Sequence, residues 1–154
     1  MLTRPPGTPN SPVPRVGQPL SDFTLPDLQG NRVQLSALRG KVVFINVWAT
    51  WCPPCIEEMP TMQRLYDRFH NRGLEVLAIS IDALGTQVVA PFMQKYRLTF
   101  PALLDPEGTI ERLYHTSGVP ESFIVDKRGR LVEKVVGPRD WTHPQVIALF
   151  ERLL

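Results

Sequence analysis

The only two cysteines of the chain, Cys52 and Cys55, lie in the stretch Trp51-Cys52-Pro53-Pro54-Cys55. A cysteine reacts as its thiolate, and a free thiol with a pKa of about 8.5 is only slightly ionised at neutral pH. A helix N-terminus stabilises an anion through its unpaired N–H groups and its dipole, and Cys52 directly precedes a helical pattern. Lowering the pKa of Cys52 to about 7 requires about 2 kcal/mol of thiolate stabilisation, much of which a helix end supplies.

Cys55 would lie in the first helical turn, close enough to attack a mixed disulfide at Cys52. The spacing fits a dithiol that cycles between oxidised and reduced forms.

Two other uses of the cysteine pair are less consistent with the sequence. A disulfide that closes so small a loop stabilises a fold by only about 2 kcal/mol, against about 4.7 kcal/mol for a hundred-residue loop. A structural zinc site needs four ligands, and the chain has no second cysteine pair and only three isolated histidines. These histidines, which we expect on the surface or in loops, are His70, His115 and His143. We therefore predict neither a metal site nor a cofactor.

The cysteines lie between two segments that read as buried strands. Residues 42–48 and 74–81 are almost continuously apolar and rich in β-branched side chains, as in strands that are buried on both faces. Between them, apolar residues recur every three or four positions from Ile56 to Phe69, which indicates a helix that ends near Gly73. We expect a right-handed β-α-β unit with parallel strands, and the cysteines at the junction of its first strand and its helix.

The remaining chain alternates short strand-like and helical segments. Residues 23–35 predict a hairpin around the turn at 28–31, and residues 126–130 predict a tight connection between two antiparallel strands. The other predicted elements are a helix at 86–98, a strand at 101–104, a helical turn at 109–114, strands at 121–125 and 131–136, and a terminal helix from Pro144.

Length and composition indicate one domain. The chain has 154 residues, 43% of them hydrophobic, which suits a single core at residues 21–154. Residues 1–20 hold six prolines and almost no apolar side chains, which predicts an extended linker or tail. If it is a tether, a membrane anchor would lie upstream.

The 17 basic and 15 acidic residues nearly balance, which gives no support for nucleic acid binding. No stretch approaches the roughly 20 apolar residues of a membrane span.

The chain resembles the thioredoxin superfamily, and within it the TlpA/ResA-like bacterial thiol-disulfide oxidoreductases. The matching stretches are residues 46–55 (NVWATWCPPC), 57–60 (EEMP) and 118–126 (GVPESFIVD). The resemblance covers about residues 20–154. It implies an α/β thioredoxin-like fold with a central mixed β-sheet flanked by helices, an N-terminal β-hairpin and an inserted α/β segment around residues 83–104.

The resemblance also implies roles for residues outside the cysteine pair. The proline that matches Pro120 is cis in this superfamily and faces the cysteines, and the preceding backbone, here Val119, pairs with an extended substrate segment. Trp51 is expected to be partly exposed beside the site and to shape partner contact, whereas Trp48 is expected in the core.

Glu58 matches a family glutamate. It lies one helical turn after Cys55, so its carboxylate could take the proton that Cys55 must lose before it attacks. The alternative is an acid that is simply favoured near a helix N-terminus. Asn46 stands where thioredoxins have a buried aspartate, and an asparagine cannot relay a proton, which strengthens the case for Glu58.

These observations predict a thiol-disulfide oxidoreductase, with a reductase of protein disulfides as the first hypothesis and cytochrome c maturation as a pathway that the resemblance suggests. Its partners would be protein disulfides or dithiols and an upstream thiol electron donor. We expect a monomer outside the cytoplasm, with a cytoplasmic location as the alternative. Other functions are a copper-handling metallochaperone, for which His115 is the candidate ligand, a protein disulfide oxidase or isomerase, and a peroxidase. Peroxidatic sites have a threonine three positions before the cysteine, whereas Thr50 lies two before Cys52.

Overall fold

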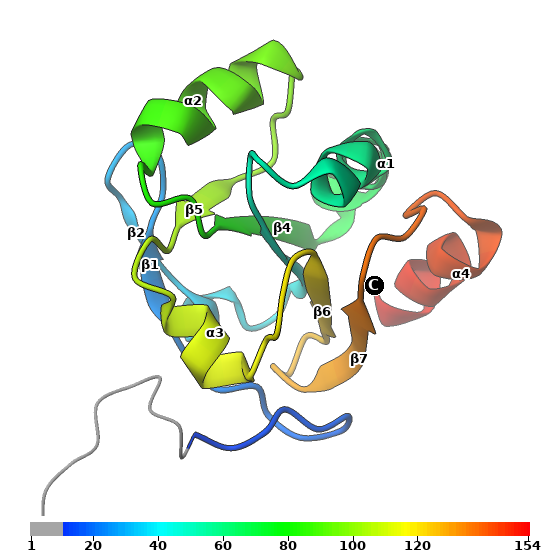
Figure 1. Cartoon of the computed structure of the whole chain (residues 1–154). Helices are drawn as coiled ribbons and strands as arrows, with labels where there is room; N and C mark the ends of the chain where they lie inside the picture. Colours follow the sequence, from blue (N-terminus) through cyan, green and yellow to red (C-terminus); the bar gives the residue numbers. More distant parts are fainter. Residues whose placement is uncertain (1–10) are drawn as a thin grey trace, which may run out of the picture.

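The computed structural model describes residues 11–154, so Pro5, Pro6 and Pro9 of the proline-rich start lie outside the described residues. The main sheet has five strands in the order β5-β4-β3-β6-β7, and a separate antiparallel pair joins β1 and β2 (Figure 1). The strands are β1 (Thr24–Pro26), β2 (Arg32–Gln34), β3 (Val42–Trp48), β4 (Leu74–Ser80), β5 (Ala102–Leu104), β6 (Glu121–Val125) and β7 (Leu131–Val136). The helices are α1 (Pro53–Phe69), α2 (Thr86–Lys95), α3 (Thr109–Tyr114) and α4 (Pro144–Leu153), with short 3₁₀ turns η1 (Leu35–Leu38) and η2 (His70–Arg72).

The central strand β3 is buried along its whole length, as its apolar sequence predicts. It pairs in parallel with β4 and antiparallel with β6, so the sheet is mixed. β4 in turn pairs in parallel with β5, and β6 pairs antiparallel with β7. The predicted α/β architecture with a central mixed sheet flanked by helices is confirmed, including the N-terminal hairpin, the β-α-β unit and the inserted segment that contains α2 and β5.

Alternate residues of β3 face two apolar layers. Phe44 and Trp48 face the layer that contains the buried side chains of α1, α2 and α4. Val43, Ile45 and Val47 face the other layer, which contains α3 and the β1–β2 hairpin. This alternation follows from the two-residue period of a strand, and it places Asn46 on the α1 side.

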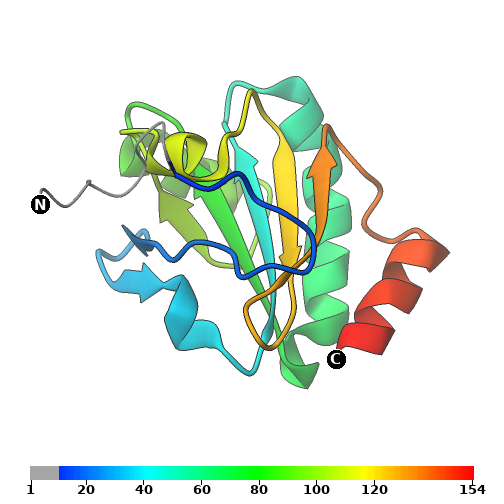
Figure 2. The same ribbon diagram turned by 90° about the horizontal axis from the view of Figure 1, so that it is seen from below.

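The described part of the N-terminal segment packs on the domain. Figure 2 shows it crossing the face of the sheet opposite α1. The N–H of Gly17 donates to the carbonyl of Leu131 (2.8 Å), the N–H of Leu20 donates to that of Gly129 (3.0 Å), and Leu20 is buried. Backbone pairing with the domain therefore begins before residue 21, the position at which the sequence predicts the domain to start. Among residues 11–154, none of the helices combines the length and hydrophobicity that a membrane crossing needs.

Candidate active site

The two cysteines form a disulfide at the N-terminus of α1. Cys52 is the N-cap residue of the helix, and the two prolines that follow it occupy the first helical positions, which need no N–H donor. The N–H of Cys55 points to Cys52 Sγ at 3.3 Å, and the N–H of Ile56 donates to the Cys52 carbonyl at 3.1 Å. A thiolate at Cys52 would thus face the positive end of the helix dipole.

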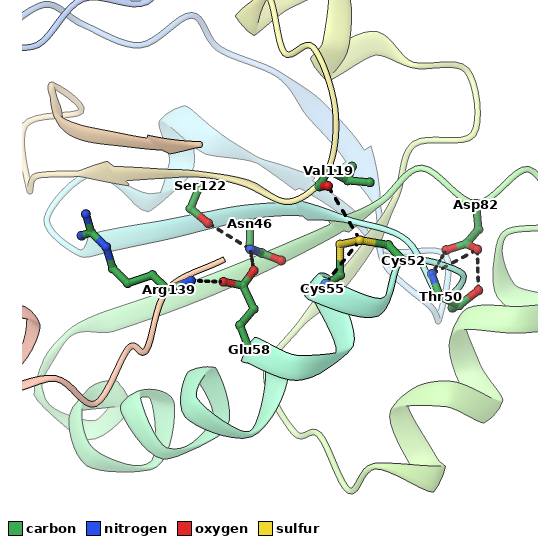
Figure 3. The surroundings of a disulfide bond; sticks show 9 residues. All are labelled: Asn46, Thr50, Cys52, Cys55, Glu58, Asp82, Val119, Ser122 and Arg139. Atoms are coloured by element: carbon green, nitrogen blue, oxygen red, sulfur yellow. Dashed lines mark hydrogen bonds between the residues drawn. A yellow bond between two sulfur atoms is a disulfide. The ribbon is translucent and has the colours of Figure 1, made fainter. Parts of the chain in front are cut away.

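The loop that precedes β6 faces the disulfide. The peptide bond between Val119 and Pro120 is cis, and the Val119 carbonyl oxygen lies 3.7 Å from Cys52 Sγ (Figure 3). Glu121 fixes the approach to this loop, because its Oε2 accepts hydrogen bonds from the N–H groups of Ser117 (2.7 Å) and Gly118 (3.1 Å). The Glu121 side chain is buried, and Lys134 Nζ lies 3.4 Å from its other oxygen.

The two tryptophans of the active-site stretch lie in opposite environments. Trp51 is 64% exposed directly beside Cys52, which itself is only 4% exposed. Trp48 is fully buried, and its ring packs against Phe92 with a centroid separation of 4.9 Å. An exposed indole beside a nearly buried sulfur offers a partner protein an apolar contact.

A buried carboxylate holds the loop between β3 and α1. Asp82, at the carboxyl end of β4, accepts from the Thr50 hydroxyl (2.6 Å), the Thr50 N–H (3.0 Å) and the Ser80 hydroxyl (2.6 Å). Thr50 is two residues before Cys52. Asp82 therefore anchors the loop that leads into Cys52 (Figure 3).

Glu58, on α1, is a further buried acid of this region, with 3% of its surface exposed. Its carboxylate accepts from Asn46 Nδ2 (2.8 Å), Trp141 Nε1 (3.0 Å) and the N–H of Arg139 (3.1 Å). Burial raises the pKa of Glu58 above its ordinary value, and the three hydrogen bonds offset this only in part. Glu58 is thus a carboxyl group near the cysteine pair that holds a proton more readily than a carboxyl in water.

Asn46 links β3, β6 and α1. It is paired in register with Ser122, and its Nδ2 donates both to Glu58 and to the Ser122 hydroxyl (2.9 Å). The Asn46 side chain is fully buried, and its oxygen has no donor within the part of the chain that the structure describes.

Most of the residues singled out in the sequence meet at one end of the sheet. Cys52 is bonded to Cys55 and contacts the Val119 carbonyl, Pro120 follows in the same loop, and Glu58 lies one helical turn along α1 (Figure 3). The sequence did not identify Asp82, Glu121, Arg139 or Trp141. The position of Asp82 could have been recognised, because the carboxyl ends of the adjacent parallel strands β3 and β4 lie at the same edge. Trp141 lies in an irregular segment without such a signal.

The hydrogen bonds of the three histidines join them to groups other than the cysteine pair. His70 Nδ1 lies 2.9 Å from the Tyr66 carbonyl oxygen, His115 Nε2 lies 2.6 Å from that of Ser11, and His143 caps α4. Within residues 11–154, no three His, Cys, Asp or Glu side chains are grouped so as to hold a metal ion.

Comparisons with known proteins agree with this geometry. Residues 16–134 match the model of the AhpC/TSA family. The chain is 40% identical over 124 residues to the thiol-disulfide oxidoreductase ResA of Bacillus cereus, an alignment that covers 80% of this chain and 70% of that protein. It is 41% identical over 128 residues to ResA of Oceanobacillus iheyensis, covering 80% of this chain and 66% of that protein.

Solved structures show the same fold. A thioredoxin-family thiol:disulfide interchange protein from Chlorobium tepidum superposes with a TM-score of 0.73 at 26% identity, covering 90% of this chain and 94% of that one. StoA from Bacillus subtilis superposes with a TM-score of 0.69 at 26% identity, covering 85% and 95%. With its Cys-Pro-Pro-Cys disulfide at the helix N-terminus, the chain belongs to the thioredoxin-like AhpC/TSA family and is a thiol-disulfide oxidoreductase similar to ResA.

Proposed function

We propose that this oxidoreductase works as a reductase of protein disulfides, with Cys52 as the attacking sulfur and Cys55 as the resolving one. The observation that carries this order of use is the position of Cys52, which caps α1 and lies 3.7 Å from the Val119 carbonyl oxygen. Cys55 is fully buried, so a partner disulfide reaches Cys52 first.

In the first step, the Cys52 thiolate attacks the partner disulfide. A new S–S bond joins Cys52 to one partner sulfur, and the other partner sulfur leaves as a thiolate that takes up a proton. We assign Val119 and Pro120 to hold the partner chain in an extended form at this point. The exposed indole of Trp51 supplies an apolar contact for side chains next to the partner cysteine.

In the second step, Cys55 loses its proton and attacks the Cys52 sulfur of the mixed disulfide. The second partner sulfur leaves as a thiolate, and the Cys52–Cys55 disulfide forms. We assign Glu58 to take the Cys55 proton, because it is a buried carboxylate one helical turn away with a raised pKa. A dithiol donor then returns two electrons and restores both thiols.

Trapping the mixed disulfide tests this order. In Cys55→Ser, a peptide disulfide should become covalently attached to Cys52 and accumulate, because the resolving thiol is gone. The matched Cys52→Ser variant should accumulate none, since its remaining thiol is buried. Equal trapping by both variants would contradict the assignment.

We further propose that the protein acts outside the cytoplasm as a monomer, on disulfides of apocytochromes during cytochrome c maturation. The resemblance to the TlpA/ResA-like proteins supports this. The test is reduction of a peptide with an apocytochrome-type Cys-x-x-Cys-His disulfide, compared with a scrambled peptide disulfide.

Copper titration with and without blocked cysteines tests the alternative of a copper metallochaperone, because a reductase should bind no copper stoichiometrically.

A further inference from the structure

The orientation of the Asn46 amide is fixed by its neighbours. Its Nδ2 lies 2.8 Å from Glu58 Oε1 and 2.9 Å from the Ser122 hydroxyl. With Glu58 ionised, its carboxylate accepts hydrogen bonds and cannot donate them, so the amide nitrogen faces Glu58. The Asn46 oxygen is therefore directed to the other side of the amide.

On that side lies Cys55. Figure 3 shows the Asn46 amide between the Glu58 carboxylate and the cysteine pair, with its oxygen pointing toward Cys55. Both Asn46 and Cys55 are fully buried, and no group of the described residues donates to the Asn46 oxygen. Buried acceptors of native proteins are nearly always paired, so an unpaired one beside a redox centre needs a physical explanation.

The oxidation state supplies that explanation. In the disulfide, Cys55 carries no hydrogen and cannot donate. When a donor dithiol passes two electrons to the disulfide, the S–S bond breaks and the two sulfurs together take up to two protons from the donor thiols. The helix N-terminus favours the thiolate at Cys52, so the retained proton belongs on Cys55.

We propose that the Cys55 thiol donates a hydrogen bond to the Asn46 oxygen in the reduced protein, so that Asn46 stabilises the protonated thiol and the reduced form. The oxygen has this partner in one oxidation state only, and the amide nitrogen remains bonded to Glu58 in both. Asn46 thereby keeps Cys55 protonated until a mixed disulfide forms, and it ties the thiol to the carboxylate that receives the proton. This inference rests on the order of cysteine use proposed above.

A vibrational measurement tests the hydrogen bond directly. Cys52→Ala leaves Cys55 as the only thiol of the chain, so its S–H stretching band is unambiguous in infrared spectra. With Asn46 present, the band should lie at the lower frequency of a hydrogen-bonded thiol. Adding Asn46→Leu, a substitution of similar shape without polar atoms, should shift it to the frequency of a free thiol. A free-thiol band with Asn46 present would overturn the proposal, whether or not the double variant folds.

Equilibrium with a glutathione buffer gives a second readout. In the chain with both cysteines, Asn46→Leu should lower the equilibrium ratio of reduced to oxidised protein by about fivefold, the size expected for loss of one neutral hydrogen bond. Ser122→Ala removes the other partner of the Asn46 nitrogen and leaves the oxygen in place, so its ratio should match the wild type. An unchanged ratio in Asn46→Leu would overturn the proposal. Failure to reduce a protein disulfide would instead contradict the proposed function, and the infrared band would still report on Asn46.

Discussion

Glu58 shows how burial and hydrogen bonding compete at one side chain. Burial raises its pKa above the ordinary value of 4.5, and donors from Asn46, Trp141 and Arg139 lower it by less. The folded chain therefore binds this proton more tightly than the unfolded chain. Its contribution to stability is complete below pH 4.5 and is lost as the pH rises through the raised pKa.

A comparison of wild type with Glu58→Gln isolates this titration, because other acids cancel in the difference. The free energy of unfolding of wild type minus that of the variant should fall with rising pH and level off above the raised pKa. Urea denaturation of the oxidised proteins across the pH series measures it. A difference that is independent of pH would show that Glu58 titrates normally.

The same substitution tests the proton transfer. Glu58→Gln should slow the attack of Cys55 on the mixed disulfide by about 100-fold at neutral pH, the usual size of a general-base contribution. Quenched-flow detection should then show the mixed disulfide accumulating. Glu57→Gln, which alters the neighbouring exposed acid, is the matched control and should resolve the intermediate at the wild-type rate. Equal rates in both variants would remove Glu58 from the mechanism.

Asp82 has a structural role, because its carboxylate is the shared hydrogen-bond acceptor for Thr50 and Ser80. Asp82→Ala leaves the Thr50 N–H, the Thr50 hydroxyl and the Ser80 hydroxyl without this acceptor, and it should lower the free energy of unfolding by about 3 kcal/mol. Thr50→Val removes only the hydroxyl bond and should cost about 1 kcal/mol. Chemical denaturation of the oxidised proteins checks both values, and similar losses in the two variants would mean that the carboxylate is not the anchor.

The turn between β6 and β7 depends on Gly129. Its φ of +81° lies in the left-handed region, and a Cβ there would also meet the Arg39 guanidinium. Gly129→Ala should therefore destabilise the fold by about 1–2 kcal/mol. Gly118→Ala is the control, because a Cβ at that position meets no atom within 4 Å and no positive φ opposes it. Thermal denaturation should place the control close to wild type, and an equally stable Gly129→Ala would contradict the strain.

The elements predicted from sequence are those with strong periodic signals. The buried run of β3 and the apolar spacing of α1 placed the cysteines at a strand-to-helix junction, and the structure confirms both elements. The tight connection at residues 126–130 was likewise predicted, and Gly129 within it has a positive φ. Asn46 was noted for the aspartate it replaces, but its bonds to Ser122 and Glu58 depend on strand register, which one sequence does not specify.

Long-range packing explains what the sequence did not reveal. Trp141 reaches Glu58 across 83 positions of the chain, from a segment with no regular structure. Residues 17–20 looked like part of a linker because they are rich in polar and turn-forming types. Their backbone nevertheless pairs with residues 129–131, an interaction that depends on where the β6–β7 turn lies in space. Composition reports on side chains and misses such backbone pairing.

The molecule as a whole places one nearly buried sulfur at a helix end, a facing loop and a buried carboxylate at one end of a mixed sheet. This arrangement suits disulfide exchange in either direction, because each step is reversible. The reduction potential of the Cys52–Cys55 pair therefore decides whether the protein donates or withdraws electrons.

The most direct measurement is the equilibrium of this pair with thiol buffers of known potential. A reductase should show a potential near the thioredoxin value of about −270 mV, which lets it reduce less stable partner disulfides. Cys55→Ser, which cannot form the internal disulfide, is the control for non-specific oxidation. A potential near about −120 mV, the value of the strong oxidant DsbA, would contradict the account and identify the protein as an oxidase.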